Sequence, residues 1–158
     1  MTRARWTGAL AMVAVFALSA VAMAADSNIG TWKLNLAKSK FDPGPAPKRH
    51  TLTNKAWVTE GVSYLSEGVG ADGKAFSWSF QGKYDEKFVP FKGNPDADMI
   101  SYKRIDANTV DSTTQMKGAV TGHTHVVVSA DGKTRTLTQT GKNAKGQEIH
   151  NTLVFEKQ

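Results

Sequence analysis

From Gly30 to its end, the chain consists mainly of short runs in which apolar and polar residues alternate. These runs are rich in Thr, Val, Tyr, Phe and Trp, and none shows the 3.6-residue period of an amphipathic helix. Alternation with a period of two places successive side chains on opposite faces of a strand. The pattern therefore predicts about ten β-strands, near residues 30–36, 48–58, 62–69, 74–84, 87–91, 98–105, 109–116, 119–129, 133–141 and 147–157.

Turn-forming residues separate these runs at short intervals. Ala71-Asp72-Gly73 and Ala130-Asp131-Gly132 suit tight turns that end on a left-handed glycine, and Asp106-Ala107-Asn108 can use Asn108 in the same way. Sequential strands with short turns form an antiparallel meander, which leaves two open edges unless it closes. We therefore expect an all-β fold, an up-and-down antiparallel barrel of about ten strands. A two-sheet sandwich is the alternative, although it usually needs longer connections.

The first 24 residues are predicted to be a signal peptide. Arg3 and Arg5 precede an apolar run, and Ala22-Met23-Ala24 has the small-x-small pattern of a cleavage site. The run is short for a membrane span, and no basic stop-transfer cluster follows it. We expect cleavage near Ala24-Ala25, one domain over residues 25–158, and a periplasmic or secreted protein that is not integral to a membrane.

Composition and motifs narrow the possible functions. The full chain has a formal charge of +6, and its lysines are scattered, whereas nucleic-acid binding needs a concentrated basic surface. The chain has no cysteine, so its core alone must hold the fold. It contains no Gly-x-Ser-x-Gly elbow, phosphate-binding glycine loop or His-Glu-x-x-His motif. No cofactor is expected, and the oligomeric state is left open.

An aromatic row marks the predicted interior. If Gly70 pairs with Lys74, then Phe76, Trp78 and Phe80 share a face with Tyr64. Fully burying one such ring contributes about 1.5–3 kcal/mol, so this face is predicted to point inward. A small filled core and a ligand cavity are both consistent with it.

The Asp106–Asn108 hairpin brings a charge toward this interior. Its more apolar face carries Tyr102 and Met116, and the same face includes Arg104. A buried guanidinium is costly unless it is paired, so Arg104 is a candidate contact for an anionic head group. The alternative is a position in water at the barrel rim. The predicted ligand-binding residues are Tyr64, Phe76, Trp78, Phe80, Tyr102, Arg104 and Met116.

Two stretches near the start of the domain resemble known families. Asn28-Ile29-Gly30-Thr31-Trp32-Lys33-Leu34 resembles the opening strand of lipocalins and fatty-acid-binding proteins, members of the calycin group, in which Gly-x-Trp begins the first barrel strand. The longer run from Gly30 to Lys48 is similar to poorly characterised exported bacterial proteins with lipocalin-like barrels. The resemblance implies that Trp32 plugs the closed end of the barrel. A two-helix lid of the fatty-acid-binding type is not evident, so that subfamily's ligand and portal are not carried over.

Two histidines share one face of the run VTGHTHVVVS. If Ser129 pairs with Lys133, the opposite face is apolar at its ends and uncharged, and is predicted to point inward. That inward face comprises Val120, Gly122, Thr124, Val126, Val128, Thr134, Thr136, Thr138, Thr140, Ile149, Asn151, Leu153 and Phe155. The outward face then carries His123, His125, Arg135, Leu137, Gln139 and His150.

This assignment argues against a metal site. His123 and His150 would lie two strands apart, with Gln139 between them and about 9–10 Å separating their backbones on a convex surface. Zinc needs nitrogens at about 2.0–2.1 Å from one centre. If the faces were reversed, His123, His125, His150 and Arg135 would converge, and a metal, haem or acid–base site would become plausible.

Three functions follow from these patterns. The first is an exported barrel, not an enzyme, that binds a small apolar or amphipathic ligand in its interior. The second is an enzyme in a lipocalin-like barrel, with His123, His125 or His150 as general base near Arg135 or Arg104. The third is an interaction module that uses the exposed polar strand face.

Overall fold

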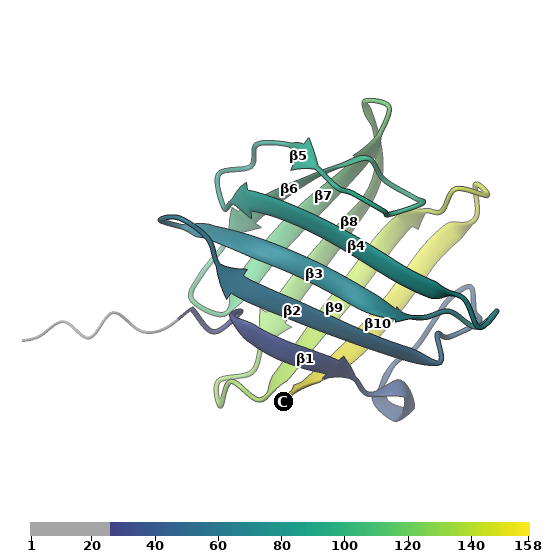
Figure 1. The fold of residues 1–158 in the computed structure, drawn as a ribbon, viewed down its shortest axis with the longest axis horizontal. Coiled ribbons are helices and arrows are strands. Elements are labelled where there is room, and N and C mark those ends of the chain that lie inside the picture. Colours follow the sequence, from purple (N-terminus) through teal and green to yellow (C-terminus); the bar gives the residue numbers. More distant parts are fainter. Residues whose placement is uncertain (1–25) are drawn as a thin grey trace, which may run out of the picture.

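The computed structural model describes residues 26–158, which form ten strands and one short 3₁₀ helix (Figure 1). All ten predicted strands are present. They are β1 (Gly30–Leu34), β2 (Arg49–Ala56), β3 (Gly61–Val69), β4 (Ala75–Lys83), β5 (Val89–Pro90), β6 (Met99–Arg104), β7 (Thr109–Met116), β8 (Ala119–Val128), β9 (Thr134–Lys142) and β10 (Glu148–Lys157), with η1 (Leu36–Lys38) after β1. The predicted signal peptide and its cleavage position lie outside the described residues. No helix among residues 26–158 is long and apolar enough to cross a membrane.

The strands form one antiparallel sheet in the order β4-β3-β2-β1-β10-β9-β8-β7-β6-β5. Figure 1 shows β1 to β4 in front of β6 to β10, with the two layers crossing. The sheet nearly closes between β4 and the residues after β5, where Ser79 and Lys92 exchange backbone hydrogen bonds of 3.0 and 2.9 Å. The up-and-down antiparallel barrel expected from the meander is therefore confirmed.

One end of the barrel, here termed the closed end, is filled by side chains around Trp32. The Trp32 ring is fully buried, and its Nε1 donates to the carbonyl oxygen of Asn28 at 3.3 Å. The amide of Asn54 donates to the same oxygen at 3.0 Å. The chain thus begins its first strand by packing the indole across the barrel.

The predicted faces of the β3–β4 and β6–β7 hairpins are confirmed. Tyr64 pairs with Phe80, and Ser66 pairs with Trp78, so the aromatic row shares the inner face of β3 and β4. Tyr102 pairs with Ser112 on the inner face of β6 and β7, and both side chains are buried. Alternation was sufficient here because both turns have the expected three-residue length.

The predicted register of the β8–β9 hairpin is wrong by one residue. The Ser129 amide bonds the carbonyl of Thr134 rather than that of Lys133, at 2.8 Å. The Ser129 hydroxyl also accepts from the Thr134 amide at 2.9 Å, a contact that Gly70 cannot make in the similar turn before β4. A four-residue connection results, and a one-residue slip reverses the faces of a strand.

This slip exchanges the inner and outer residues of β9. The threonines at 134, 136, 138 and 140, predicted inward, lie on the outer face, whereas Arg135, Leu137 and Gln139 point inward beside Val128, Val126 and Thr124. A second correction concerns Val120, which is 56% exposed. Thr121 is an extra residue in β8, because Thr114 pairs with Gly122 while Gln115 pairs with Val120, and this bulge turns Val120 outward.

Candidate functional site

A cavity of about 200 Å³ lies inside the barrel, toward the end opposite Trp32. We call this the cavity end. Its mouth is bordered by the loop between β5 and β6, at Asn94 and Asp96, and by the ends of β9 and β10, at Lys142 and Ile149. Deeper in the barrel, the cavity reaches Tyr102, Val126 and Leu137, among other residues. The interior is thus only partly filled by side chains.

Three of the predicted ligand-binding residues line this cavity: Tyr64, Trp78 and Tyr102. Two more support them from behind. Phe80 stacks on Tyr64 with ring centroids 4.9 Å apart, and Phe76 stacks on Trp78 at 4.8 Å. The aromatic row therefore forms one wall of the cavity.

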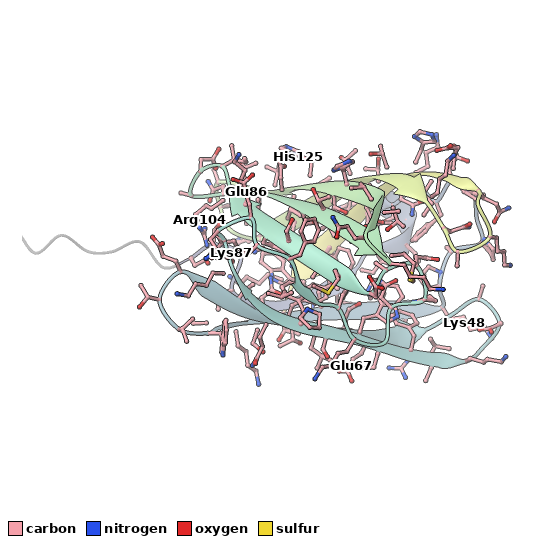
Figure 2. All side chains as sticks on the ribbon, turned by 90° about the horizontal axis from the view of Figure 1, so that it is seen from above. Lys48, Glu67, Glu86, Lys87, Arg104 and His125 are labelled. Carbon is pink, nitrogen blue, oxygen red and sulfur yellow. The ribbon has the colours of Figure 1, made fainter. Side chains whose placement is uncertain are left out.

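The other two predicted residues, Arg104 and Met116, are not among the lining residues of this cavity. Arg104 lies at the closed end, near the start of the described chain (Figure 2). Its Nη2 donates to Asp26 Oδ2 at 2.5 Å, and its guanidinium carbon lies 3.9 Å from the centre of the Tyr84 ring. Its charge is already matched by a carboxylate, so we do not include it in the candidate site.

Arg135 was predicted on the outer face, but in the structure it lies inside the barrel. The slip in β9 turns it inward, and its side chain is fully buried. Among the described residues, none of its three guanidinium nitrogens makes a hydrogen bond of good geometry, although the group lies close enough to the Tyr102 hydroxyl to lower the pKa of that tyrosine against the effect of burial. The centre of the Trp32 ring lies 6.0 Å from the guanidinium carbon. An inward-facing cation without a carboxylate is the least compensated group of the interior.

The field of Arg135 reaches both cavity tyrosines. Burial raises the pKa of Tyr64 and of Tyr102, and the positive charge of Arg135 opposes that rise at both hydroxyls. Arg135 itself is not among the cavity-lining residues, although Leu137, two positions along the same face, is. The guanidinium therefore lies just beyond the inner end of the cavity, beside the two tyrosines.

His50 is a second interior residue that the sequence analysis missed. Its Nε2 lies 2.7 Å from Ser66 Oγ, and its ring meets Phe155 edge-on at 5.1 Å. Burial, with a smaller contribution from the charge of Arg135, lowers the pKa of His50 to about 4, so the ring is neutral at pH 7. The signal was present in the sequence, because His50 shares strand parity with the buried Leu52 and Asn54.

The other three histidines lie outside, as predicted. His123, His125 and His150 are exposed, and Figure 2 shows His125 on the outer surface. His125 Nδ1 lies 2.6 Å from Asp111 Oδ1. The residue between His123 and His150 is Thr140 rather than the predicted Gln139, again because of the slip in β9. The enzyme and metal alternatives required these rings inside, and that condition is not met.

Residues 26–158 contain no group of three or more histidine, cysteine or acidic residues placed to hold a metal ion. The polar groups of the interior are one guanidinium, the neutral imidazole of His50, hydroxyls and amides, and they lie beside aromatic rings. These groups suit non-covalent binding of a polar molecule with an apolar body.

Comparisons with known proteins assign neither a family nor a function to this chain. No protein-family model matches the sequence, and no curated protein matches it significantly. One solved structure similar to this chain is zebrafish ileal bile acid-binding protein complexed with cholic acid. It is 9% identical, the match covers 84% of this chain and 99% of that chain, and the TM-score is 0.49. A similarity at this level does not transfer a ligand.

Proposed function

We propose that the barrel binds a small amphipathic molecule that carries a negatively charged group. The observation that carries this proposal is the fully buried guanidinium of Arg135, which has no anionic partner among the described residues and lies beside the inner end of a cavity. A ligand anion at the inner end of the cavity, beside Tyr64 and Tyr102, would lie in the field of this guanidinium. This proposal keeps the anionic contact inferred from the sequence but assigns it to Arg135 instead of Arg104.

The energetic argument is one of charge compensation. Transferring an ionised group into a protein interior costs several kcal/mol even after relaxation, and an attractive partner must offset that cost. Arg104 meets this requirement with Asp26. Arg135 has no such partner among the described residues, and a guanidinium does not lose its proton at neutral pH. A ligand carboxylate, which can accept two parallel hydrogen bonds from a guanidinium, supplies the missing charge.

The cavity limits the size of the ligand. Its volume of about 200 Å³ is below the range of roughly 300–1,000 Å³ for drug-sized ligands. An apolar cavity of about 150 Å³ in another protein accommodates benzene. The volume here thus suits one ring with small substituents, and we use benzoate as the probe.

The test compares benzoate with benzyl alcohol, its uncharged counterpart, by titration calorimetry on residues 25–158. We expect benzoate to bind more tightly, and Arg135→Met to remove this preference while benzyl alcohol binds as before. Arg104→Met is the matched control, because Arg104 is paired and distant from the cavity, and it should leave the preference intact. Equal binding of both probes by the unaltered protein, or an undiminished preference in Arg135→Met, would refute the assignment.

We also propose that the protein acts after export, in the periplasm or outside the cell. The N-terminal pattern of a basic lead, an apolar run and a small-x-small site supports this. N-terminal sequencing of the protein recovered from its native host should find Ala25 first. Recovery of a chain that begins at Met1 from the cytoplasmic fraction would contradict it.

A further inference from the structure

A row of polar side chains crosses the inner face of five neighbouring strands. Backbone pairing aligns the residues of this row, one from each strand from β6 to β10, and all five line the cavity. We call them the polar row: Tyr102, Ser112, Thr124, Gln139 and Asn151. An unbroken row of polar groups inside a barrel is unusual, since inward positions are generally apolar.

The polar row is only partly satisfied by the protein. Asn151 donates to Gln139 at 3.3 Å and accepts from the Asp42 amide at 2.9 Å. Within residues 26–158, no hydrogen bond engages the hydroxyl of Ser112 or of Thr124. The neighbouring register row differs, because the Thr114 hydroxyl bonds both Thr121 and the Gly122 carbonyl. Two hydroxyls of the polar row thus keep their capacity for a partner in the cavity.

The cavity wall opposite the polar row is aromatic. Tyr64, Trp78 and Phe91 line the cavity there, on or beside the strands that carry the aromatic row. Ring faces favour flat apolar or aromatic groups, whereas hydroxyls and amides favour groups that donate or accept hydrogen bonds. A molecule that satisfies both walls is a ring that carries hydroxyl groups on part of its edge.

Apart from Tyr102, whose hydroxyl lies near the guanidinium, the residues of the polar row are displaced from the charge along the barrel. Arg135 and Gln139 share the inner face of β9 and are separated by four residues, about 13 Å along the strand, with Leu137 between them. A ligand anchored by its anion near Arg135 therefore presents its far end to the polar row. The two polar features select opposite ends of the same molecule.

We propose that the ligand class is hydroxylated aromatic carboxylic acids, with the polar row as the determinant of hydroxyl specificity. This inference rests on the proposed function for its anionic anchor. The ring packs against Trp78 and Tyr64, the carboxylate points toward Arg135, and a ring hydroxyl exchanges hydrogen bonds with Thr124 and Ser112. Binding involves no covalent step.

The test measures the calorimetric affinities of benzoate, 4-methylbenzoate and 4-hydroxybenzoate. The methyl and hydroxyl compounds have similar shapes, so their ratio isolates the hydrogen bond. We expect 4-hydroxybenzoate to bind about three- to tenfold more tightly than 4-methylbenzoate, as one net hydrogen bond allows. In Thr124→Val and Ser112→Ala this ratio should fall, and Thr124→Ser, which keeps the hydroxyl, should restore it.

One control and three outcomes decide the test. Thr138→Val makes the same change on the exposed outer face of β9 and should leave the ratio unchanged. If benzoate binds but 4-hydroxybenzoate has no advantage over 4-methylbenzoate, this inference fails and the proposed function stands. If the advantage persists in both Thr124→Val and Ser112→Ala, the polar row is not its source and the inference is overturned. If none of the three acids binds, both proposals fall.

Discussion

The closed end and the cavity end of this barrel use the same residue types in opposite ways. At the closed end, Arg104 is held by Asp26 and covered by Tyr84, and Trp32 fills the space between the strands. Between this end and the cavity, Arg135 has no anionic partner among the described residues, and at the cavity end Trp78 borders open space. A charge with a partner in the protein contributes to structure, whereas a buried charge without one indicates where a ligand supplies the partner.

The largest expected difference between the two ends concerns their tryptophans. Trp32→Ala removes a fully buried ring and should lower the free energy of unfolding by about 3–5 kcal/mol. Trp78→Ala should cost less than half of this, because the ring is partly exposed and already borders open space. Urea unfolding followed by circular dichroism measures both. Equal losses would show that the cavity end is packed as tightly as the closed end.

A pH effect follows from His50, which lies among the aromatic residues of the interior. Its pKa is about 4 in the folded protein and near 6.5 when unfolded, so the unfolded chain binds the extra proton between these values. Above pH 6.5 this group should therefore not affect the free energy of unfolding. As the pH drops from 6.5 to 4, the free energy of unfolding should fall by about 3 kcal/mol. His50→Gln should flatten this part of the curve, and His150→Gln, on the exposed face, should not. A flat curve in the unaltered protein would place His50 in water.

The alternation of apolar and polar residues predicted all ten strands, because a barrel strand buries one face and exposes the other. It failed at one turn and at the bulge of Thr121 in β8. Ala-Asp-Gly-Lys follows both Gly70 and Ser129, yet the hydroxyl of Ser129 bonds the Thr134 amide and lengthens the second connection. Strand periodicity carries no information about such a local side-chain contact.

That single turn determined how much of the candidate site was predictable. Tyr64, Trp78 and Tyr102 could be placed because their hairpins have the expected register. Arg135 could not, because its face depends on the connection before β9, and an interior arginine contradicts the apolar pattern on which face assignment rests. Of the polar row, Tyr102, Thr124 and Asn151 were already assigned inward, whereas Gln139 was not, and the alignment of the row depends on the pairing of five strands.

The two arginines should respond oppositely to the same substitution. Arg135→Met removes an uncompensated buried charge and should raise the free energy of unfolding of the ligand-free protein by about 2 kcal/mol. Arg104→Met breaks a partly exposed pair and should lower it by about 1 kcal/mol. Chemical denaturation without ligand tests both. If Arg135→Met destabilises the protein, the guanidinium has a structural role and the comparison fails.

The smallest expected effect concerns a contact across the mouth of the cavity. Asp96, in the loop between β5 and β6, accepts a hydrogen bond of 2.7 Å from the amide of Ala144 in the β9–β10 turn. Asp96→Ala should weaken the contact between these two loops by about 1 kcal/mol and speed benzoate release about fivefold, with little change in the global free energy of unfolding.

Asp72→Ala is the matched control. The Asp72 carboxylate accepts from the Lys74 amide at 3.0 Å and lies near the Lys74 side chain, and both contacts are within its own turn. Stopped-flow displacement measures the release. Equal rates in Asp96→Ala and the unaltered protein would mean that ligands leave by another route. The next place to test would be the junction at Ser79 and Lys92, where β4 meets the residues after β5.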